Sequence, residues 1–79
     1  MDNLTCIEDI ARETIGRVVN RDPLTIAPDT TLGELAPSGV ITLLRHLERQ
    51  FRLPEQSLTL SPANNFGELI NCVAELRNA

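Results

Sequence analysis

The sequence predicts one small all-α domain, a four-helix bundle with three main helices and one short helix. Three segments carry apolar residues at helical spacing, and no segment alternates apolar and polar residues for long enough to predict a strand. The 79 residues fit a single domain over positions 1–79. Hydrophobic residues make up 42% of the chain, and Phe51 and Phe66 are its only aromatic residues, so the core must be mainly aliphatic.

The first helix is predicted from about Asn3 to Val19, with Asn3 or Thr5 as its cap. Its apolar positions follow the spacing i, i+3, i+4, i+7, i+11 of one helix face. These positions are Ile7, Ile10, Ala11, Thr14 and Val18.

Residues 20–31 are predicted to form a long loop, because they hold two prolines and two aspartates and show no helical period. We expect Leu24, Ile26 and Leu32 to turn inward and hold this loop against the core. Residues 32–35 are expected to form one helical turn.

The second main helix is predicted to start near Ser38 or Gly39 and to end before Pro54, which cannot continue a helix. Its apolar positions repeat the spacing of the first helix, and Ile41 widens the stripe. They are Val40, Leu43, Leu44, Leu47 and Phe51. The polar face is expected to hold Thr42, Arg45, His46, Glu48, Arg49 and Gln50.

A short helical turn over residues 54–58 and a loop over residues 61–65 are expected next. The last helix is predicted to begin with Asn65 as its N-cap and Glu68 three positions later, a pair that resembles a capping box. Its apolar face is Phe66, Leu69, Ile70, Val73 and Leu76.

The charge balance disfavours some classes of partner. Eleven acidic residues against seven arginines give a net charge of −4, which repels phosphate backbones, so we expect no nucleic-acid binding. The same charge suits partners with basic docking surfaces. The start of the chain, residues 1–4, lacks the pattern of a signal peptide, and no apolar run reaches membrane-spanning length. We therefore expect a monomeric cytoplasmic protein that does not bind membranes.

Side chains that suggest catalysis are scarce. Cys6 and Cys72 are expected to be reduced thiols that act as small buried hydrophobes. His46 is the only histidine, and Glu48 lies two residues on, off the same helix face. With no paired nucleophile and base, no metal-ligand cluster and no phosphate loop, the sequence predicts neither an enzyme nor a metal site.

Three sequence blocks stand out, together with the order of the predicted elements. They are residues 24–35, LTIAPDTTLGEL, residues 43–54, LLRHLERQFRLP, and residues 65–70, NFGELI. The first resembles the pattern I-x-P-D-x-x-L-x-E-L of the acyl carrier protein family, whose members carry phosphopantetheine. The second is similar to the family's L-x-x-x-L-E-x-x-F-x-x-x-x-P, and the third looks like the start of its last helix. The resemblance covers nearly the whole chain.

This resemblance implies that Ser38 carries a covalent 4′-phosphopantetheine arm, which would hold acyl or polyketide-type intermediates as thioesters. The implied partners are a phosphopantetheinyl transferase and the enzymes of fatty acid or polyketide biosynthesis. The chemistry agrees, since an exposed hydroxyl at a helix start is accessible and the helix dipole favours the phosphodiester anion. A serine there also serves as a plain N-cap.

The attachment motif differs from the family's Gly-x-Asp-Ser-Leu, because Pro37 and Gly39 replace Asp and Leu. An ungapped count from Phe51 places Pro37 at the attachment position, and a one-residue shift restores Ser38. The predicted second helix is also basic on its polar face, where the family is acidic. A second interpretation is therefore a degenerate carrier-like domain without the arm, which acts as a protein interaction module.

The surface that would bind a partner protein also has two interpretations. The basic face of the second helix is either a plain solvated surface or a sign of unusual partners. Acidic residues elsewhere offer another docking surface: Glu8, Asp9, Glu13, Asp22, Asp29 and Glu34.

Overall fold

A computed structural model describes residues 3–78 of the chain, with side chains for residues 6–77. Within this range it contains four α-helices, one 3₁₀ turn and no strand. They are α1 (Asn3–Val19), η1 (Pro23–Thr25), α2 (Leu32–Leu35), α3 (Val40–Gln50) and α4 (Phe66–Asn78). The predicted all-α bundle, with three main helices and one short one, is confirmed.

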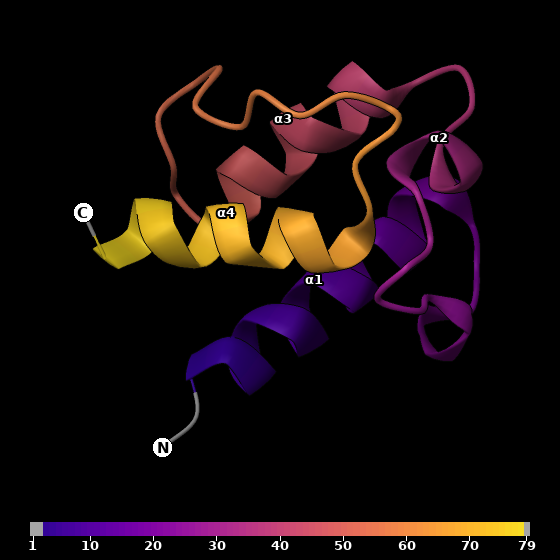
Figure 1. Cartoon of the computed structure of the whole chain (residues 1–79), viewed down its shortest axis with the longest axis horizontal. Coiled ribbons are helices and arrows are strands. Elements are labelled where there is room, and N and C mark those ends of the chain that lie inside the picture. Colours follow the sequence, from indigo (N-terminus) through magenta and orange to yellow (C-terminus); the bar gives the residue numbers. More distant parts are fainter. Residues whose placement is uncertain (1–2, 79) are drawn as a thin grey trace.

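Of the three main helices, α3 and α4 both pack against α1. Figure 1 shows α4 crossing α1, and α2 at the turn that leads into α3. The shortest extent of the molecule is 19 Å, which corresponds to two layers of helices about 10 Å in diameter. No helix in the described range is both long enough and apolar enough to cross a membrane.

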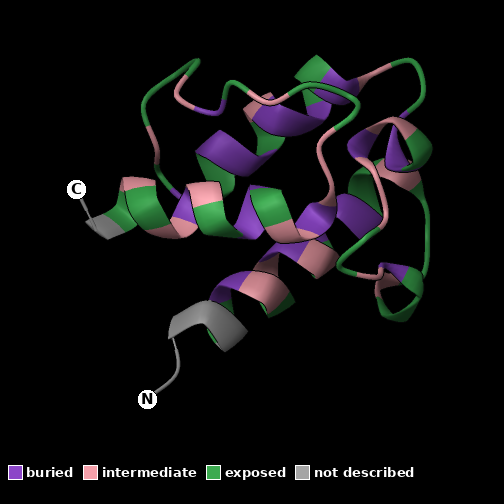
Figure 2. Cartoon of the chain, in the orientation of Figure 1, coloured by how far each residue is buried: buried purple, intermediate pink, exposed green. Residues whose placement is uncertain are grey.

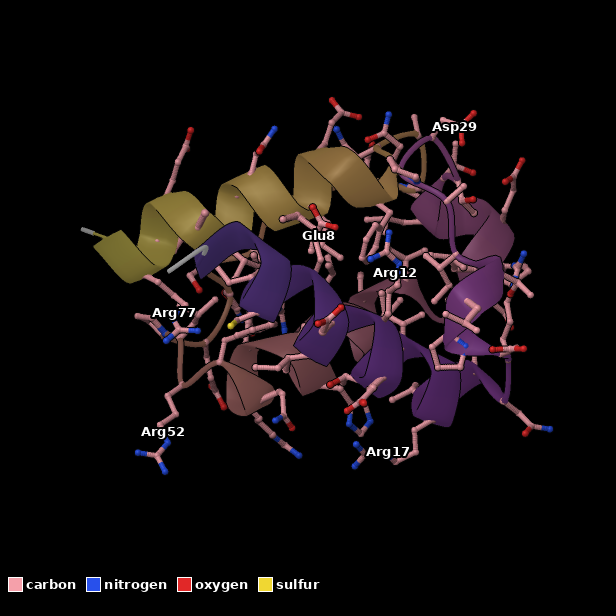
Figure 3. The ribbon with its side chains drawn as sticks, turned by 90° about the horizontal axis from the view of Figure 1, so that it is seen from below. Glu8, Arg12, Arg17, Asp29, Arg52 and Arg77 are labelled. Atoms are coloured by element: carbon pink, nitrogen blue, oxygen red, sulfur yellow. The ribbon has the colours of Figure 1, made fainter. Side chains whose placement is uncertain are left out.

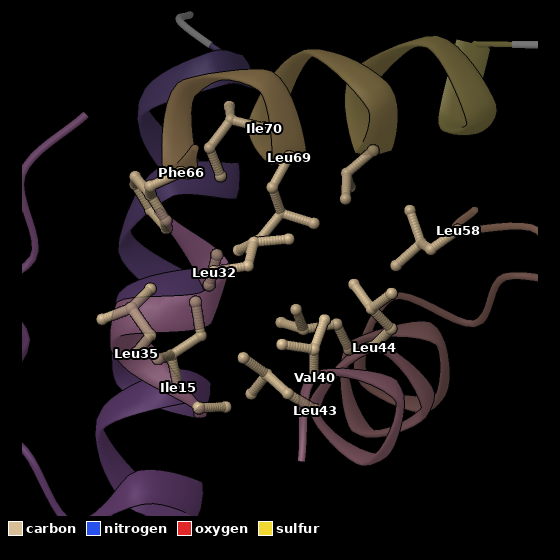
Figure 4. Close-up of a cluster of buried hydrophobic side chains, with 14 of the residues drawn as sticks. Ile15, Leu32, Leu35, Val40, Leu43, Leu44, Leu58, Phe66, Leu69 and Ile70 are labelled. Atoms are coloured by element: carbon tan, nitrogen blue, oxygen red, sulfur yellow. The ribbon is translucent and has the colours of Figure 1, made fainter. Parts of the chain in front are cut away.

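The core is aliphatic, as predicted, and every main helix contributes one buried stripe to it (Figures 2 and 4). The predicted stripe of α1 is only partly right. Ile15 is fully buried, whereas Val18, which was assigned to the buried face, is 38% exposed. Thr14 is buried, and its hydroxyl donates a hydrogen bond to the Ile10 carbonyl, 2.8 Å away, which offsets the cost of burying this polar group. The proposed caps of α1, Asn3 and Thr5, lie outside the described side chains.

The chain leaves α1 through a left-handed residue, Asn20, with a φ of 57°. The next residue, Arg21, donates its backbone N–H to the Gly16 carbonyl at 2.8 Å, which closes the end of the helix. A Cβ atom on Gly16 would lie 2.5 Å from the Arg21 carbonyl oxygen. Glycine at this position is therefore required by the close approach of the loop.

The first loop turns two of its three predicted apolar side chains inward. Ile26 and Leu32 are buried, but Leu24 is 90% exposed, so its predicted inward position is wrong. The cause is local, because the Asp22 side chain accepts a hydrogen bond from the Leu24 N–H and holds this residue on the outside of η1.

Helix α3 buries its predicted apolar positions: Val40, Leu43, Leu44, Leu47 and Phe51. Ile41 does not widen this stripe, since it is 68% exposed. Arg52, with a φ of 56°, ends the helix, and the Leu53 N–H donates to the Glu48 carbonyl at 2.8 Å. The helix thus ends in a left-handed cap before it reaches Pro54.

Residues 54–58 do not form the expected short helix. They form a turn in which the Ser57 N–H donates to the Pro54 carbonyl at 3.2 Å, and Gln56 has a φ of 64°. A left-handed residue inside the segment breaks the helical path. The short helix of the bundle is α2, which precedes α3.

The capping box of α4 is confirmed. The Glu68 N–H donates to Asn65 Oδ1 at 2.8 Å, and the Asn65 N–H donates to Glu68 Oε1 at 2.9 Å. The same region joins the two long loops, because the Phe66 N–H donates to the Thr30 carbonyl and the Leu32 N–H donates to the Asn64 carbonyl. These bonds fix α2, and with it the turn into α3.

Candidate functional site

Ser38 lies in the exposed turn that connects α2 to α3. The N-cap of α3 is Gly39, whose carbonyl accepts the first helical bond from the Leu43 N–H at 2.9 Å. The Gly39 N–H donates back to the Ala36 carbonyl at 3.2 Å, which fixes the turn. Ser38 therefore precedes the cap and is not itself the N-cap, so the plain-cap interpretation is wrong.

The Ser38 hydroxyl forms no hydrogen bond with any residue that the structure describes. The other two serines differ in this respect. The Ser57 hydroxyl donates to the Pro54 carbonyl at 2.6 Å, and the Ser61 hydroxyl pairs with Asn64 Oδ1 at 3.1 Å. Of the three serine hydroxyls, that of Ser38 is the one without a hydrogen-bond partner among the described residues.

The start of α3 provides a favourable setting for an anion. Its N-cap has no side chain, so no side-chain hydrogen bond caps the first N–H groups of this helix. These N–H groups and the helix dipole stabilise negative charge close to Ser38. A phosphodiester on Ser38 would therefore be placed at the positive end of an 11-residue helix.

Pro37 shares this turn and is exposed, but it has no hydroxyl to modify. A shallow hollow of ≈ 380 Å³ lies beside the turn, and we call it the Ser38 hollow. It is lined by Val18, Val19, Leu35, Ala36, Pro37, Ser38, Gly39 and Thr42. Polar and apolar atoms line it in similar measure, so it can contact both parts of a group attached to Ser38.

Glu48 does not lie on the solvated face of α3, where the helical pattern predicts it. It is only 1% exposed. Its carboxylate accepts hydrogen bonds from the backbone N–H groups of Gln56 (3.1 Å) and Leu58 (2.9 Å), and it pairs with Arg45 at 2.7 Å. The predicted solvated face of α3 thus contains one buried anion that fastens residues 54–58 to the helix.

Burial alone would raise the pKa of Glu48. The N–H groups of Leu58 and Gln56 and the Arg45 guanidinium outweigh that effect, and the pKa of this carboxyl is held below its ordinary value. Glu48 therefore stays charged and acts as a structural anchor. No local pattern marks this role, because the N–H groups that Glu48 binds lie 8 and 10 residues further along the chain.

The remaining reactive side chains form no second centre. His46 is exposed on α3, and no group of three metal-ligating side chains exists among the described residues. Cys6 and Cys72 are free thiols, but Cys6 is exposed, so its predicted burial is wrong. Cys72 is half-buried, and burial together with the nearby Glu75 carboxylate raises the pKa of its thiol.

The acidic residues that were expected to offer a docking surface are partly engaged within the chain. Glu8 pairs with Arg12 at 3.3 Å, and Asp22 caps η1. Figure 3 shows Glu8 and Arg12 close together, with Asp29 in a different part of the molecule. Asp9, Glu13, Asp29 and Glu34 are exposed.

Comparison of the chain with protein-family models, with curated proteins and with solved structures found no match. The functional interpretation therefore rests on the residues and the geometry described above.

Proposed function

We propose that this chain is a carrier protein in which Ser38 bears a 4′-phosphopantetheine arm. The observation that carries the proposal is the exposed, unbonded hydroxyl of Ser38 in a fixed turn at the start of α3. The order of helices and the sequence blocks that resemble acyl carrier proteins support it. The chain itself would catalyse no reaction, and we expect it to act as a cytoplasmic monomer.

The attachment reaction requires coenzyme A and a phosphopantetheinyl transferase. The Ser38 oxygen would attack the phosphorus of the pantetheine phosphate, and a new phosphodiester would form. The pyrophosphate bond of coenzyme A would break and release 3′,5′-ADP, and the hydroxyl proton would pass to a base of the transferase. The anionic product would be stabilised by the free N–H groups at the start of α3.

The thiol of the arm would then hold an acyl or polyketide-type intermediate as a thioester. Enzymes of fatty acid or polyketide biosynthesis would act on this intermediate while it stays tethered. The role of this chain in that scheme is to present the arm from a rigid turn, which the bonds of Gly39 and the paired loops support.

Intact-mass spectrometry after incubation with coenzyme A and a broad-specificity transferase tests the proposal. We expect the wild type and Ser57→Ala to gain one phosphopantetheine, and Ser38→Ala to gain none. Ser57→Ala is the matched control because it removes a serine hydroxyl that is already bonded. An unmodified wild type, under conditions that modify a known carrier, would contradict the proposal, as would a Ser38→Ala variant that gains the mass.

A second candidate is a degenerate carrier-like domain that binds a partner protein without an arm. The replacement of the usual Asp and Leu by Pro37 and Gly39 favours it, as does the basic surface of α3. In that case Ser38→Ala would recover the same partner as the wild type in a pull-down, and the mass would not change in either protein.

A further inference from the structure

A second hollow, larger than the Ser38 hollow, lies between α1 and α3. Its volume is ≈ 550 Å³, and we call it the arginine hollow. It is lined by Thr14, Arg17, Val18, His46, Arg49 and Gln50. Its lining includes two guanidinium groups, an imidazole and a side-chain amide, and it contains no carboxylate.

The two cations of the arginine hollow are not neutralised within the described chain. Arg17 and Arg49 are exposed, and neither forms an ion pair or a side-chain hydrogen bond with a described residue. Glu13 lies one turn before Arg17 on α1 and does not pair with it within the described side chains. Arg12, by contrast, forms an ion pair with Glu8, donates a hydrogen bond to the Ile26 carbonyl and lies over the Phe66 ring. Figure 3 shows Arg12 and Arg17 projecting from α1 in different directions.

The arginine hollow is next to the Ser38 hollow, because Val18 lines both. On α3, Thr42 lines the Ser38 hollow and His46 lies one turn further on, in the arginine hollow. Gly39 and Arg49 are ten residues apart, which is about 15 Å along a helix. A group attached to Ser38 can therefore follow the seam between α1 and α3, first past the Ser38 hollow and then to the arginine side chains.

We infer that the arginine hollow binds the free carboxylate of a tethered cargo, so that the cargo class is the half-thioester of a dicarboxylic acid. This inference rests on the proposed function for the arm. Guanidinium groups bind carboxylates through paired charge-assisted hydrogen bonds. A cargo that ends in a methyl group would offer neither arginine a charged partner. Tethering keeps the local concentration of the carboxylate high, so weak contacts suffice to hold it.

The first experiment compares two cargos that differ only at their far end. A transferase loads the chain from glutaryl-coenzyme A or from pentanoyl-coenzyme A, and intact mass confirms the loading. We expect the glutaryl cargo to shift the backbone amide NMR signals of Arg17, Val18, His46 and Arg49, and the pentanoyl cargo to leave them in place. Arg17→Gln/Arg49→Gln should abolish the difference. Arg52→Gln should retain it, since Arg52 lies outside the hollow and projects away from Arg17 in Figure 3.

The second experiment removes the attachment site, so that carboxylate binding by the arginine hollow is tested independently of the arm on Ser38. Free S-glutaryl-pantetheine is titrated into Ser38→Ala, with S-pentanoyl-pantetheine as the control. We expect the glutaryl compound to shift the same four residues, and Arg49→Gln to weaken its binding by about 1.5-fold to fivefold, the range of exposed ion pairs.

A wild type that gains no mass would overturn the proposed function, while the Ser38→Ala titration would still decide whether the hollow binds a carboxylate. Equal shifts from the two cargos, or shifts that persist in Arg17→Gln/Arg49→Gln, would overturn the inference. A hollow that responds to a polyglutamate peptide but to neither glutaryl compound would overturn it as well.

Discussion

At the scale of single residues, the buried carboxylate of Glu48 joins helix α3 to the loop that follows it. It satisfies two backbone N–H groups of residues 54–58 and one guanidinium at the same time. Glu48→Gln removes the charge and presents an amide N–H₂ group to a backbone N–H donor. We expect it to lower the free energy of unfolding by about 2 to 4 kcal/mol, measured by urea denaturation, because one bonded oxygen is replaced by a donor and Arg45 loses its charged partner.

A nearby carboxylate provides the matched control for this substitution. Glu55 is exposed, so Glu55→Gln should change the free energy of unfolding by less than about 0.5 kcal/mol. Equal effects of the two substitutions would mean that the hydrogen bonds of Glu48 contribute nothing beyond its charge.

The lowered pKa of Glu48 also predicts how stability depends on pH. Because the folded chain holds the pKa of this carboxyl below the ordinary value of 4.5, the folded state binds the proton less readily than the unfolded state. The stabilisation is therefore complete above about pH 4.5 and is lost as the pH falls through the folded-state pKa. Urea denaturation between about pH 5 and about pH 3 should show a steeper loss for the wild type than for Glu48→Gln. Parallel losses in the two proteins would contradict this assignment.

At the scale of the helices, we expect Gly16→Ala to destabilise the protein, although helix propensity alone would predict stabilisation. Alanine inside a helix normally stabilises it by about 1 kcal/mol relative to glycine. Here the new Cβ would lie 2.5 Å from the Arg21 carbonyl oxygen, so the end of α1 must shift. We expect Gly16→Ala to lower the free energy of unfolding by about 1 to 3 kcal/mol, measured by chemical denaturation.

Gly67 is the control for this effect. A Cβ there meets its nearest atoms at 3.4 Å, an ordinary contact, so Gly67→Ala should be neutral or stabilising. A stabilising Gly16→Ala substitution would contradict the close approach of the Arg21 carbonyl to the end of α1.

The elements themselves could be predicted because their signals are local. The bounds of α1 and the capping box of Asn65 and Glu68 follow from residues within one helix or one turn. The errors lie where the outcome depends on distant partners. Periodicity gives the apolar face of a helix but not its width, so Val18 and Ile41 were assigned to the core. Nothing near Glu48 in the sequence shows that the N–H groups of a later loop need its carboxylate.

The candidate site likewise has features that the local sequence predicts and features that it does not. The place of Ser38 near the start of α3 follows from the sequence, because the apolar stripe and Pro37 mark the beginning of the helix. Its free hydroxyl does not, since that depends on Gly39 taking the cap position. The two hollows depend on how α1 crosses α3, which helical periodicity does not encode.

At the scale of the whole molecule, a chain of 79 residues has little stability to lose, about 5 to 10 kcal/mol. Leu47 is completely buried between the helices, so Leu47→Ala should leave a cavity and cost about 2 to 5 kcal/mol. Ile41 lies on the same helix and is 68% exposed, so Ile41→Ala should leave the stability nearly unchanged. Thermal melts followed by circular dichroism should therefore show a large fall in Tm for the first variant only. Similar melts for both would mean that α3 packs through a different face, and the turn that presents Ser38 would then be oriented differently.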